Sequence, residues 1–375
     1  MELIVFGPGH PFRGGIARTT TELVRSLQAR GHRLHFLTPR RQYHSWLYPG
    51  RDDRDPDACP RLENAVEILD PLAPLSWPGS RRKALALAAD AWVIPYWTWA
   101  WAGWWRFLLK GRRPPTVAVV HNPADHDAHR LQRLAARIVL GRCQGLFTHA
   151  RSLARGLEVA YPGTPVAFHP LPPPELEALP PAAEARAGLG LTGSRRMALF
   201  LGLIRPYKGV DLLLNAMARL SSDDDWYLVV AGEPWGNLGA TLEAQVRELG
   251  LEDRVRLDLE WVPEPEVPRL LAAADVVVLP YRAGSQSAVA PLALGAGVPV
   301  LSTAVGGVPE VVRHGVDGVI VPPGSADELA RALQELDRER LAELMAGALE
   351  GRQRLSWQGY ADALEGLLQQ VVAEN

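Results

Sequence analysis

Cysteine, lysine and net charge are all scarce in this chain of 375 residues. The two cysteines, Cys59 and Cys143, argue against a disulfide framework and fit a reducing compartment. Three of the forty Lys and Arg residues are lysines, so each lysine stands out. The formal net charge of −2 gives no reason to expect nucleic acid as a partner, because binding to a phosphate backbone needs a concentrated positive field.

The chain also lacks an apolar run long enough to cross a bilayer. Its longest uncharged stretch, residues 91–105, contains a proline and falls short of the roughly 20 apolar residues that a spanning helix needs. The N-terminus begins with a strand-like run and shows no secretion signal. We therefore expect a cytoplasmic protein that is at most peripheral at the inner face of the membrane.

That uncharged stretch is rich in tryptophan, and a basic cluster follows it. Six of the twelve tryptophans lie there: Trp92, Trp97, Trp99, Trp101, Trp104 and Trp105. Indole rings beside cations suit a membrane interface, so the segment from Trp92 to Arg113 predicts a peripheral membrane contact. The same residues fit a buried strand and a core helix, because tryptophans on helices usually pack inside. Both interpretations stay open at the level of sequence.

Short apolar runs alternate with amphipathic segments in both halves of the chain. The expected strands of the first half are residues 3–6, 34–37, 92–94, 117–120 and 146–148. Those of the second half are residues 197–201, 227–231, 255–257, 276–279, 298–301 and 318–321. The alternation predicts an α/β fold of two Rossmann-like domains, each a doubly wound parallel sheet, with a ligand cleft between the domains.

A proline-rich stretch separates the two series of strands. Residues 169–196 show little apolar periodicity, which favours an exposed linker. We therefore expect an N-terminal domain at residues 1–168, a C-terminal domain at residues 197–355, and a closing helix at residues 356–375. The closing helix is expected to pack back toward the N-terminal domain.

Two cations mark the first turn of the second domain. Residues 202–209 read Gly-Leu-Ile-Arg-Pro-Tyr-Lys-Gly and follow an expected strand. Arg205 and Lys208 then stand at the carboxyl end of a strand, which is where ligands bind in open α/β sheets. They could hold an anionic group such as a diphosphate, and ordinary surface charges on a solvated turn are the alternative.

The first domain offers a glycine turn and a histidine at strand ends. Gly14 and Gly15 open an expected helix, where backbone N–H groups can approach an anion. The spacing is not Gly-x-Gly-x-x-Gly, so a nicotinamide cofactor is not indicated. His121 directly follows the strand at residues 117–120. Its imidazole could bind a sugar hydroxyl or carry a proton, or it could serve the structure alone.

A second polar turn follows the strand at residues 276–279. It consists of Gly284, Ser285, Gln286 and Ser287. Ser285 or Ser287 is the expected N-cap of the next helix, which would leave first-turn N–H groups for a phosphate. A further glycine pair follows at residues 306–307, and the joint placement of these turns with the two cations indicates one anion site. The three aspartates at residues 223–225 are interpreted as a solvated charge run rather than a metal site.

From residue 198 to residue 321 the chain resembles the GT-B glycosyltransferases of family four, which use nucleotide sugars. The resemblance rests on Phe200-Leu-Gly-Leu-Ile-Arg-Pro-Tyr-Lys-Gly, Val229-Val-Ala-Gly-Glu, Ala274-Asp-Val-Val-Val-Leu-Pro-Tyr, Gly306-Gly-Val-Pro-Glu and Gly315-Val-Asp-Gly. The first half is similar more loosely, through Gly14-Gly15-Ile-Ala, His121-Asn and Ser356-Trp357. The resemblance implies a retaining hexosyl transfer from a nucleotide sugar, with UDP or GDP, to a glycan or lipid-linked acceptor. It implies no cofactor and no metal.

The resemblance also implies roles for the residues of these turns. Arg205 and Lys208 would neutralise the leaving diphosphate, and His121 would contact the transferred sugar, which makes these three the expected catalytic residues. Gly14 and Gly15 would approach the diphosphate from the first domain. The remaining expected donor-binding residues are Glu233, Trp261, Val262, Gly284, Ser285, Gln286 and Ser287, with the nucleotide base near Trp261 and Val262.

The chain departs from the family pattern at two positions. Typical members carry two glutamates eight positions apart, and here these positions read Gly284 and Leu292, with no glutamate between residues 266 and 310. Leucine cannot bind a ribose hydroxyl, a loss of roughly 1–3 kcal/mol. Gln286 or Ser287 is expected to take over. The alternatives are a catalytically degenerate subunit that binds a nucleotide or glycan, and a nucleotide-sugar epimerase.

Overall fold

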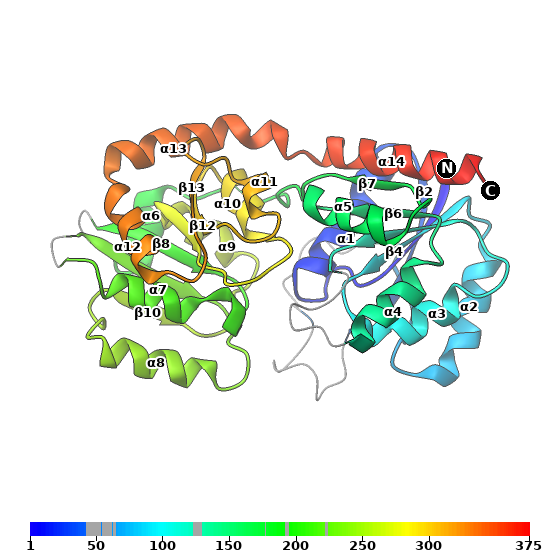
Figure 1. Ribbon diagram of the computed structural model, residues 1–375, viewed down its shortest axis with the longest axis horizontal. Coiled ribbons are helices and arrows are strands. Elements are labelled where there is room, and N and C mark those ends of the chain that lie inside the picture. The colour runs from blue at the N-terminus through cyan, green and yellow to red at the C-terminus, as the bar shows by residue number, and fades with distance from the viewer. Residues whose placement is uncertain are drawn as a thin grey trace. The chain divides into compact units, whose positions relative to one another are not determined.

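The computed structural model describes residues 1–42, 54, 62, 65–122, 130–176, 178–191, 195–221 and 224–375. Its contacts divide the chain into two compact units, each with its own core (Figure 1). The first unit comprises Met1–Leu171 and Trp357–Asn375, and the second comprises Pro172–Ser356. The expected linker is not featureless, because it contains helix α6 (Ala182–Gly188), which packs on α9 (Glu266–Ala273) of the second unit.

The first unit is built on a parallel sheet of seven strands in the order β3-β2-β1-β4-β5-β6-β7. The strands are β1 (Glu2–Phe6), β2 (Arg33–Pro39), β3 (Ala65–Leu69), β4 (Ala91–Tyr96), β5 (Thr116–Val120), β6 (Gly145–Thr148) and β7 (Val166–Phe168). All five strands expected from the sequence are present. The two that were not predicted, β3 and β7, lie at the edges of the sheet, where only partial burial leaves a weak hydrophobic pattern.

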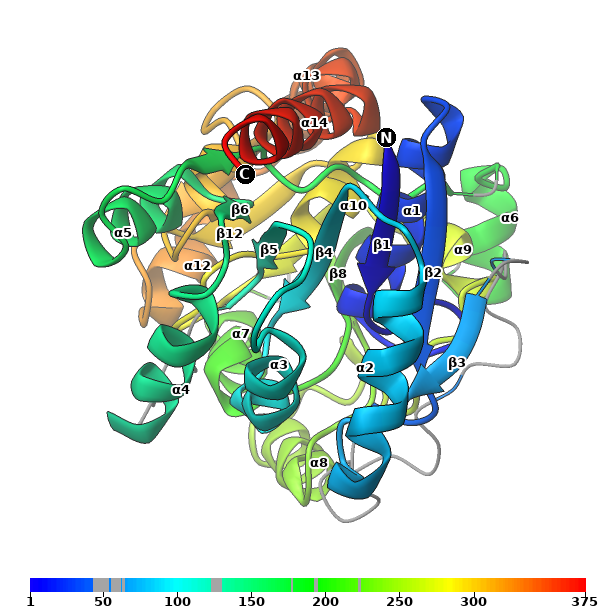
Figure 2. The ribbon, with the colours of Figure 1, turned by 90° about the vertical axis from the view of Figure 1, so that its right-hand side faces the viewer.

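Helices cover both faces of this sheet (Figure 2). On one face lie α2 (Trp77–Ala86), α3 (Ala102–Leu108), α4 (Arg130–Leu140) and α5 (Arg151–Ala160). On the other face lie α1 (Gly15–Ala29) and α14 (Trp357–Ala373), which share a core with β1, β4 and β5. Helix α14 is also tied to α1 by ion pairs from Arg30 to Asp362 (2.7 Å) and Glu365 (2.6 Å). The last helix of the chain is therefore an integral part of the first unit.

The tryptophan-rich segment belongs mainly to the core beneath α2 to α5. Trp92, Trp101, Trp104 and Trp105 are fully buried, and Trp99 is the member of the group that is 54% exposed. The core interpretation is therefore right for these four indoles, and the predicted membrane contact through them is wrong. Among the described residues, no helix is long and apolar enough to cross a bilayer.

The second unit contains a parallel sheet of six strands in the order β10-β9-β8-β11-β12-β13. The strands are β8 (Arg196–Leu201), β9 (Trp226–Ala231), β10 (Val255–Asp258), β11 (Val276–Leu279), β12 (Val300–Thr303) and β13 (Gly318–Val321). Its remaining helices are α7 (Val210–Met217), α8 (Leu238–Glu248), α10 (Val289–Gly295), α11 (Val308–Val311), α12 (Ala326–Glu335) and α13 (Arg338–Gly351). All six strands predicted from the sequence are present, and the predicted class of two doubly wound parallel sheets is confirmed.

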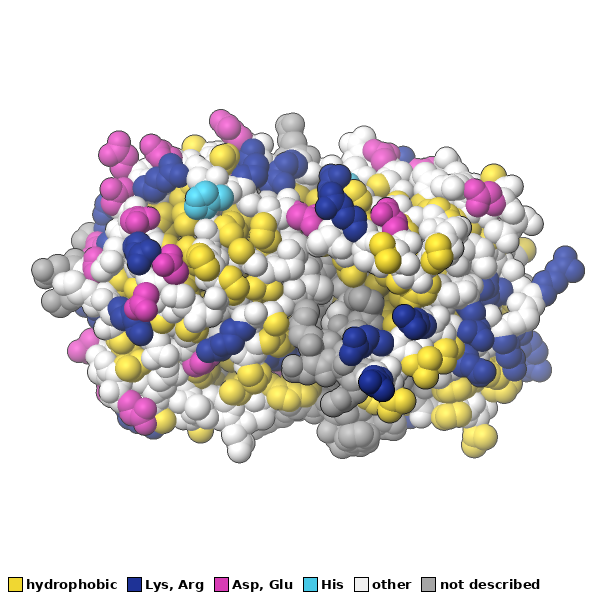
Figure 3. Space-filling view, in the orientation of Figure 1, with side chains coloured by type: hydrophobic (Ala, Val, Ile, Leu, Met, Phe, Trp, Pro, Cys, Tyr) yellow, Lys and Arg dark blue, Asp and Glu magenta, His cyan; other side chains and the backbone are white. Residues whose placement is uncertain are grey.

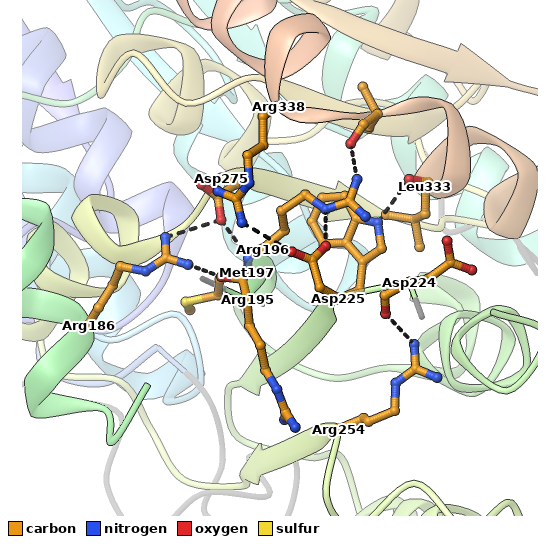
Figure 4. Close-up of polar contacts among 12 residues, drawn as sticks. Arg186, Arg195, Arg196, Met197, Asp224, Asp225, Arg254, Asp275, Leu333 and Arg338 are labelled. Carbon is orange, nitrogen blue, oxygen red and sulfur yellow. Dashed lines mark hydrogen bonds and ion pairs between the residues drawn. The ribbon is translucent and has the colours of Figure 1, made fainter. Parts of the chain in front are cut away.

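An ionic network holds the amino ends of these strands together (Figure 4). Arg196, the first residue of β8, binds Asp225 before β9 (2.6 Å), and Arg338 of α13 binds the same carboxylate (3.1 Å). Asp275 before β11 accepts from Arg186 of α6 and from the backbone N–H of Met197. The aspartate run is therefore not simply solvated: Asp225 is a structural ion-pair partner, while the first residue of the run lies outside the described residues.

Candidate functional site

The opposite, carboxyl edge of the second sheet carries the loops that the sequence singled out. The loops after β8 and β9 are joined by backbone bonds from Ile204 N–H to the Glu233 carbonyl (2.8 Å) and from Trp235 N–H to the Ile204 carbonyl (2.9 Å). The loop after β11 joins them through Arg282 N–H, which donates to the Tyr207 carbonyl (2.7 Å). Three loops from different strands therefore form one connected rim.

Arg205 projects from this rim beside an indole. Its guanidinium carbon lies 4.1 Å from the centre of the Trp235 ring, at cation–π distance. The ring covers one face of the guanidinium and leaves its N–H edge available for hydrogen bonds. Among the described residues, Arg205 makes no ion pair.

Lys208 ends a short turn, η3 (Pro206–Lys208), and points back across the rim. Its Nζ lies 5.8 Å from the centre of the Tyr281 ring and 3.7 Å from where a Cβ on Gly202 would stand. Burial, with a further contribution from the charge of Arg205, lowers the pKa of Lys208 to about 8. No carboxylate of the described chain pairs with it. Two adjacent cations without a counter-ion are what an anion site requires.

A neighbouring arginine, Arg282, differs from Arg205 and Lys208 because it has a carboxylate partner. Arg282 makes a bidentate ion pair with Asp211 of α7, with N···O distances of 2.7 and 2.6 Å, and also donates to the Pro206 carbonyl. The paired guanidinium keeps the pKa of Asp211 below its ordinary value in spite of partial burial. Arg282 therefore serves the loop structure, whereas Arg205 and Lys208 pair with no carboxylate of the described residues.

The turn at residues 284–287 lies against the second glycine turn. Gly307 N–H donates to the Ser285 carbonyl (2.8 Å). Gly306 has φ +53°, and a Cβ there would stand 2.2 Å from the Gly284 carbonyl oxygen, so only glycine fits. The Ser287 hydroxyl accepts from Val289 N–H (3.2 Å) and Ala290 N–H (3.3 Å). The N-cap residue of α10 is Ala288, so the prediction of Ser285 or Ser287 as the N-cap is wrong, although the Ser287 hydroxyl, one residue earlier, binds N–H groups of the first turn.

Glu233 supplies a carboxylate at the end of β9. Its Oε2 atom is buried and has no hydrogen-bond partner among the described residues. A buried acceptor of this kind is costly unless a donor reaches it, so it can serve hydroxyl groups of a ligand. Trp261 and Val262 follow the adjacent strand β10 and are half-buried. Gln286 is half-buried within the turn at residues 284–287.

In the first unit, His121 lies buried at the carboxyl end of β5. Its backbone N–H donates to the Tyr96 carbonyl (2.9 Å), and burial lowers its pKa to about 3. The imidazole is therefore neutral at physiological pH, which suits a hydrogen bond to a sugar better than proton transfer. Gly14 and Gly15 are exposed at the start of α1, and a Cβ on Gly14 would meet no atom within 4 Å.

The sequence did not indicate a second histidine, His149, whose ring lies beside that of His121. His149 follows β6, and its ring centre lies 4.7 Å from that of His121. On its far side it stacks on Tyr360 of α14, with centres 5.6 Å apart and an interplanar angle of 18°. Burial, and then the neighbouring His121, lower the pKa of His149 well below the ordinary value. A single histidine after a strand carries no motif, so only the pairing of β5 with β6 brings the two rings together.

Two family models match the chain, one in each half. The model for Glycosyl transferases group 1 matches residues 195–339, and the model for Glycosyltransferase Family 4 matches residues 13–173. The chain belongs to the family 4 glycosyltransferases. Its two sheets have the GT-B architecture of that family.

Individual relatives in family 4 differ in how much of the chain they match. The D-inositol 3-phosphate glycosyltransferase of Thermobispora bispora is 38% identical over 194 residues, which are 49% of this chain and 45% of the relative. A sucrose-phosphate synthase from Thermosynechococcus elongatus superposes with a TM-score of 0.82 at 20% identity, over 100% of both chains. Anabaena Alr3699/HepE, solved with UDP and glucose, gives 0.78 at 18% identity, over 98% of this chain and 99% of the other. The chain spans about half the length of the curated relatives it matches, 45% to 61% for the first four.

The structure also shows what occupies the two glutamate positions of the family. Leu292 lies in α10 with its side chain in the core of the second unit. Gly284 lies in the turn that contacts the second glycine pair, where its carbonyl oxygen approaches Gly306. Neither position supplies a side-chain hydrogen-bonding group. The polar side chains that lie between these two positions are those of Ser285, Gln286 and Ser287.

Proposed function

We propose that this chain is a retaining glycosyltransferase that moves a hexose from a nucleotide sugar, with UDP or GDP, to a glycan or lipid-linked acceptor. The observation that carries the proposal is the pair of cations, Arg205 and Lys208, beside the turn at residues 284–287. In this reading the diphosphate of the donor lies against the cations and the backbone N–H groups of that turn. The names of the curated relatives support glycosyl transfer, and the UDP in the Anabaena structure supports a nucleotide-sugar donor.

The roles of the residues follow from their chemistry. Arg205 and Lys208 stabilise the negative charge that develops on the leaving diphosphate, which removes the need for a metal ion. Neutral His121 binds a hydroxyl of the transferred sugar, and Gly14 and Gly15 offer N–H groups to the phosphates. Glu233 accepts from hydroxyls of the donor. Trp261 and Val262 border the nucleotide base.

The missing glutamates favour one alternative, a subunit that binds a nucleotide or glycan without catalysis. If the chain is catalytically active, Gln286 and Ser287 replace the lost ribose contact, and the bound donor is turned over. If the chain is inactive, it binds a nucleotide or a sugar nucleotide but does not cleave the sugar nucleotide. An epimerase would interconvert donors with no acceptor present.

One experiment separates these functions. Nucleotide release is measured across UDP-, GDP- and ADP-sugars in EDTA, with inositol 3-phosphate, oligosaccharides and lipid-linked sugars as acceptors. Acceptor-dependent release and an α-linked product from an α-linked donor support the proposal. Binding of a nucleotide without release with any acceptor, or interconversion without acceptor, contradicts it. Loss of activity in EDTA contradicts the metal-independent step.

A further inference from the structure

Trp235 is a large apolar side chain that stands outside the core of the second unit. It follows β9 and is 36% exposed, whereas Trp226 at the start of that strand is buried within the core. Single apolar side chains at a protein surface are common, so exposure alone assigns no role to this indole. The contacts of its ring must show what it does.

The ring of Trp235 contacts the guanidinium of Arg205. The guanidinium carbon lies 4.1 Å from the ring centre, closer than the 4.6 Å that separates Arg196 from the ring of Trp226. Arg196 is also fixed by a carboxylate, that of Asp225 at 2.6 Å. Arg205 pairs with no carboxylate of the described residues, so its contact with the indole takes the place of an ion pair.

Other arginines of the second unit have acidic partners. Arg219 binds Asp327 (2.6 Å), and Arg331 binds Glu328 (2.9 Å). Figure 3 shows the same pattern on the left of the view, where Lys and Arg side chains lie beside Asp and Glu side chains of this unit. Arg205 differs from these surface pairs, because an aromatic ring holds its guanidinium without neutralising the positive charge.

The backbone holds the indole and the guanidinium on adjacent loops. Trp235 N–H donates to the Ile204 carbonyl (2.9 Å), and Ile204 is the residue before Arg205. The two loops can approach this closely because position 232 is glycine: a Cβ on Gly232 would stand 2.1 Å from the Gly202 carbonyl oxygen. The two side chains are therefore carried side by side before any ligand binds.

The neighbouring lysine gives this support a purpose. Lys208 belongs to the same turn as Arg205, and repulsion between the two cations favours a conformation in which the arginine side chain extends into water. A free arginine side chain also keeps its conformational entropy, which favours the same outcome. The indole of Trp235 opposes both effects, since it attracts the guanidinium and covers one of its faces.

We propose that Trp235 is a positioning residue that holds the Arg205 guanidinium in place for the diphosphate of the donor. The N–H groups at the edge of the guanidinium, which the ring leaves open, are the ones that bind phosphate oxygens in pairs. The identity of the ligand rests on the proposed function, whereas the position of Arg205 is a property of the free protein. The two parts can therefore be tested separately.

The first test needs no ligand. The chain has three lysines, Lys83, Lys110 and Lys208, so NMR of protein labelled with [13C]lysine follows the titration of each one. Trp235→Leu is expected to shift the titration of Lys208 upward from about pH 8, because the charge of Arg205 contributes to this low pKa. Arg205→Ala should also shift it upward, and adding Trp235→Leu to Arg205→Ala should shift it no further. The other two lysines are internal controls.

The second test measures dissociation constants for UDP, GDP and inorganic diphosphate through the same lysine signal. Trp235→Leu is expected to weaken inorganic diphosphate and whichever nucleotide binds by the same factor, about five- to thirtyfold. Trp235→Phe keeps an aromatic ring and should lose less. The double variant with Arg205→Ala should bind no more weakly than Arg205→Ala alone, because the indole acts through the arginine.

A matched control is Trp99→Leu, which removes a 54% exposed indole of the first unit. It is expected to match the wild type in both tests. Trp235 lies outside the core, so Trp235→Leu should also leave the melting temperature nearly unchanged. Circular dichroism and a thermal melt confirm that each variant is folded.

Three outcomes would overturn the proposal. An unchanged titration of Lys208 in Trp235→Leu would show that Arg205 keeps its place without the indole. Losses that multiply in the double variant, or a loss that spares inorganic diphosphate, would show that the indole contacts the ligand directly. If the wild type binds none of the three probes, the proposed function fails, and the titration of Lys208 still decides whether Trp235 positions Arg205.

Discussion

Arg205 and Lys208 face the same rim, and the charge of Arg205 adds to burial in lowering the pKa of Lys208. The two residues also share a turn, in which Lys208 N–H donates to the Arg205 carbonyl at 2.9 Å. The backbone thus holds two like charges close together, where an incoming diphosphate would relieve their repulsion. Several measurable properties follow from this pair.

Donor binding should weaken at alkaline pH. The pKa of Lys208 is about 8, so its ammonium carries a charge below that pH and loses it above. The KM for the nucleotide sugar is therefore expected to rise above about pH 8, with little change between pH 6 and 7.5. Lys208→Arg keeps a cation at all these pH values, and its KM should stay flat. If KM of the wild type does not change with pH, the charge of Lys208 does not contribute to donor binding.

Removing the lysine charge should stabilise the protein without ligand. The unfolded state holds the proton of Lys208 more firmly than the folded state does, so burial of the cation reduces stability below about pH 8. Lys208→Met is expected to raise the free energy of unfolding at pH 7 by on the order of 2 kcal/mol. The gain should disappear near pH 10.5. Urea unfolding at both pH values measures it, and a loss of stability at pH 7 would contradict the electrostatic argument.

Arg205 should matter for turnover more than for folding. Arg205→Ala removes one preorganised donor from the leaving group, and kcat/KM is expected to fall about 10²- to 10³-fold with little change in the melting temperature. Arg247→Ala on the exposed part of α8 is the matched control and should keep wild-type kinetics. Equal activity of the two variants would remove Arg205 from the site.

The two buried histidines should make the first unit sensitive to acid. Their pKa values are lowered in the folded state, so the unfolded chain binds protons more readily as pH falls below about 6.5. The free energy of unfolding is expected to drop between pH 6.5 and 4, by up to about 1.4 kcal/mol per pH unit for each histidine. His149→Phe preserves the stacked ring and should show a smaller drop. An unchanged acid profile in this variant would mean that His149 titrates normally.

The ionic network at the amino ends of β8 and β9 should contribute to stability alone. Arg196 is buried, and its guanidinium binds Asp225 and the Leu336 carbonyl. Arg196→Met is expected to cost about 1–3 kcal/mol, because Asp225 keeps Arg338 as a partner and is partly exposed. Donor KM should not change. Urea unfolding and kinetics on the same preparation would show whether the two properties are separate.

The sequence predicted the strands that are buried on both faces, since their apolar runs are uninterrupted. It did not predict β3 and β7, which lie at the two edges of the first sheet and are only partly buried. It placed Arg205, Lys208 and the turn at residues 284–287 at one sheet edge, which follows from parallel strand order alone. Contacts between elements distant in sequence were out of reach: the stacking of His149 on Tyr360 depends on where the last helix packs. The sequence left a membrane contact and a core position open for the tryptophans, because composition does not reveal which side of a helix is covered.

The position of α14 has a consequence for how the chain acquires its structure during synthesis. Leu364, Leu368 and Val371 are buried against the first sheet, yet they follow every described strand of the second unit along the chain. One face of the N-terminal sheet therefore stays open until α14 has been synthesised, whereas the second unit, Pro172–Ser356, can complete its core earlier. A fragment that stops before Trp357 should expose this apolar face and aggregate, even though it contains every strand of the described residues.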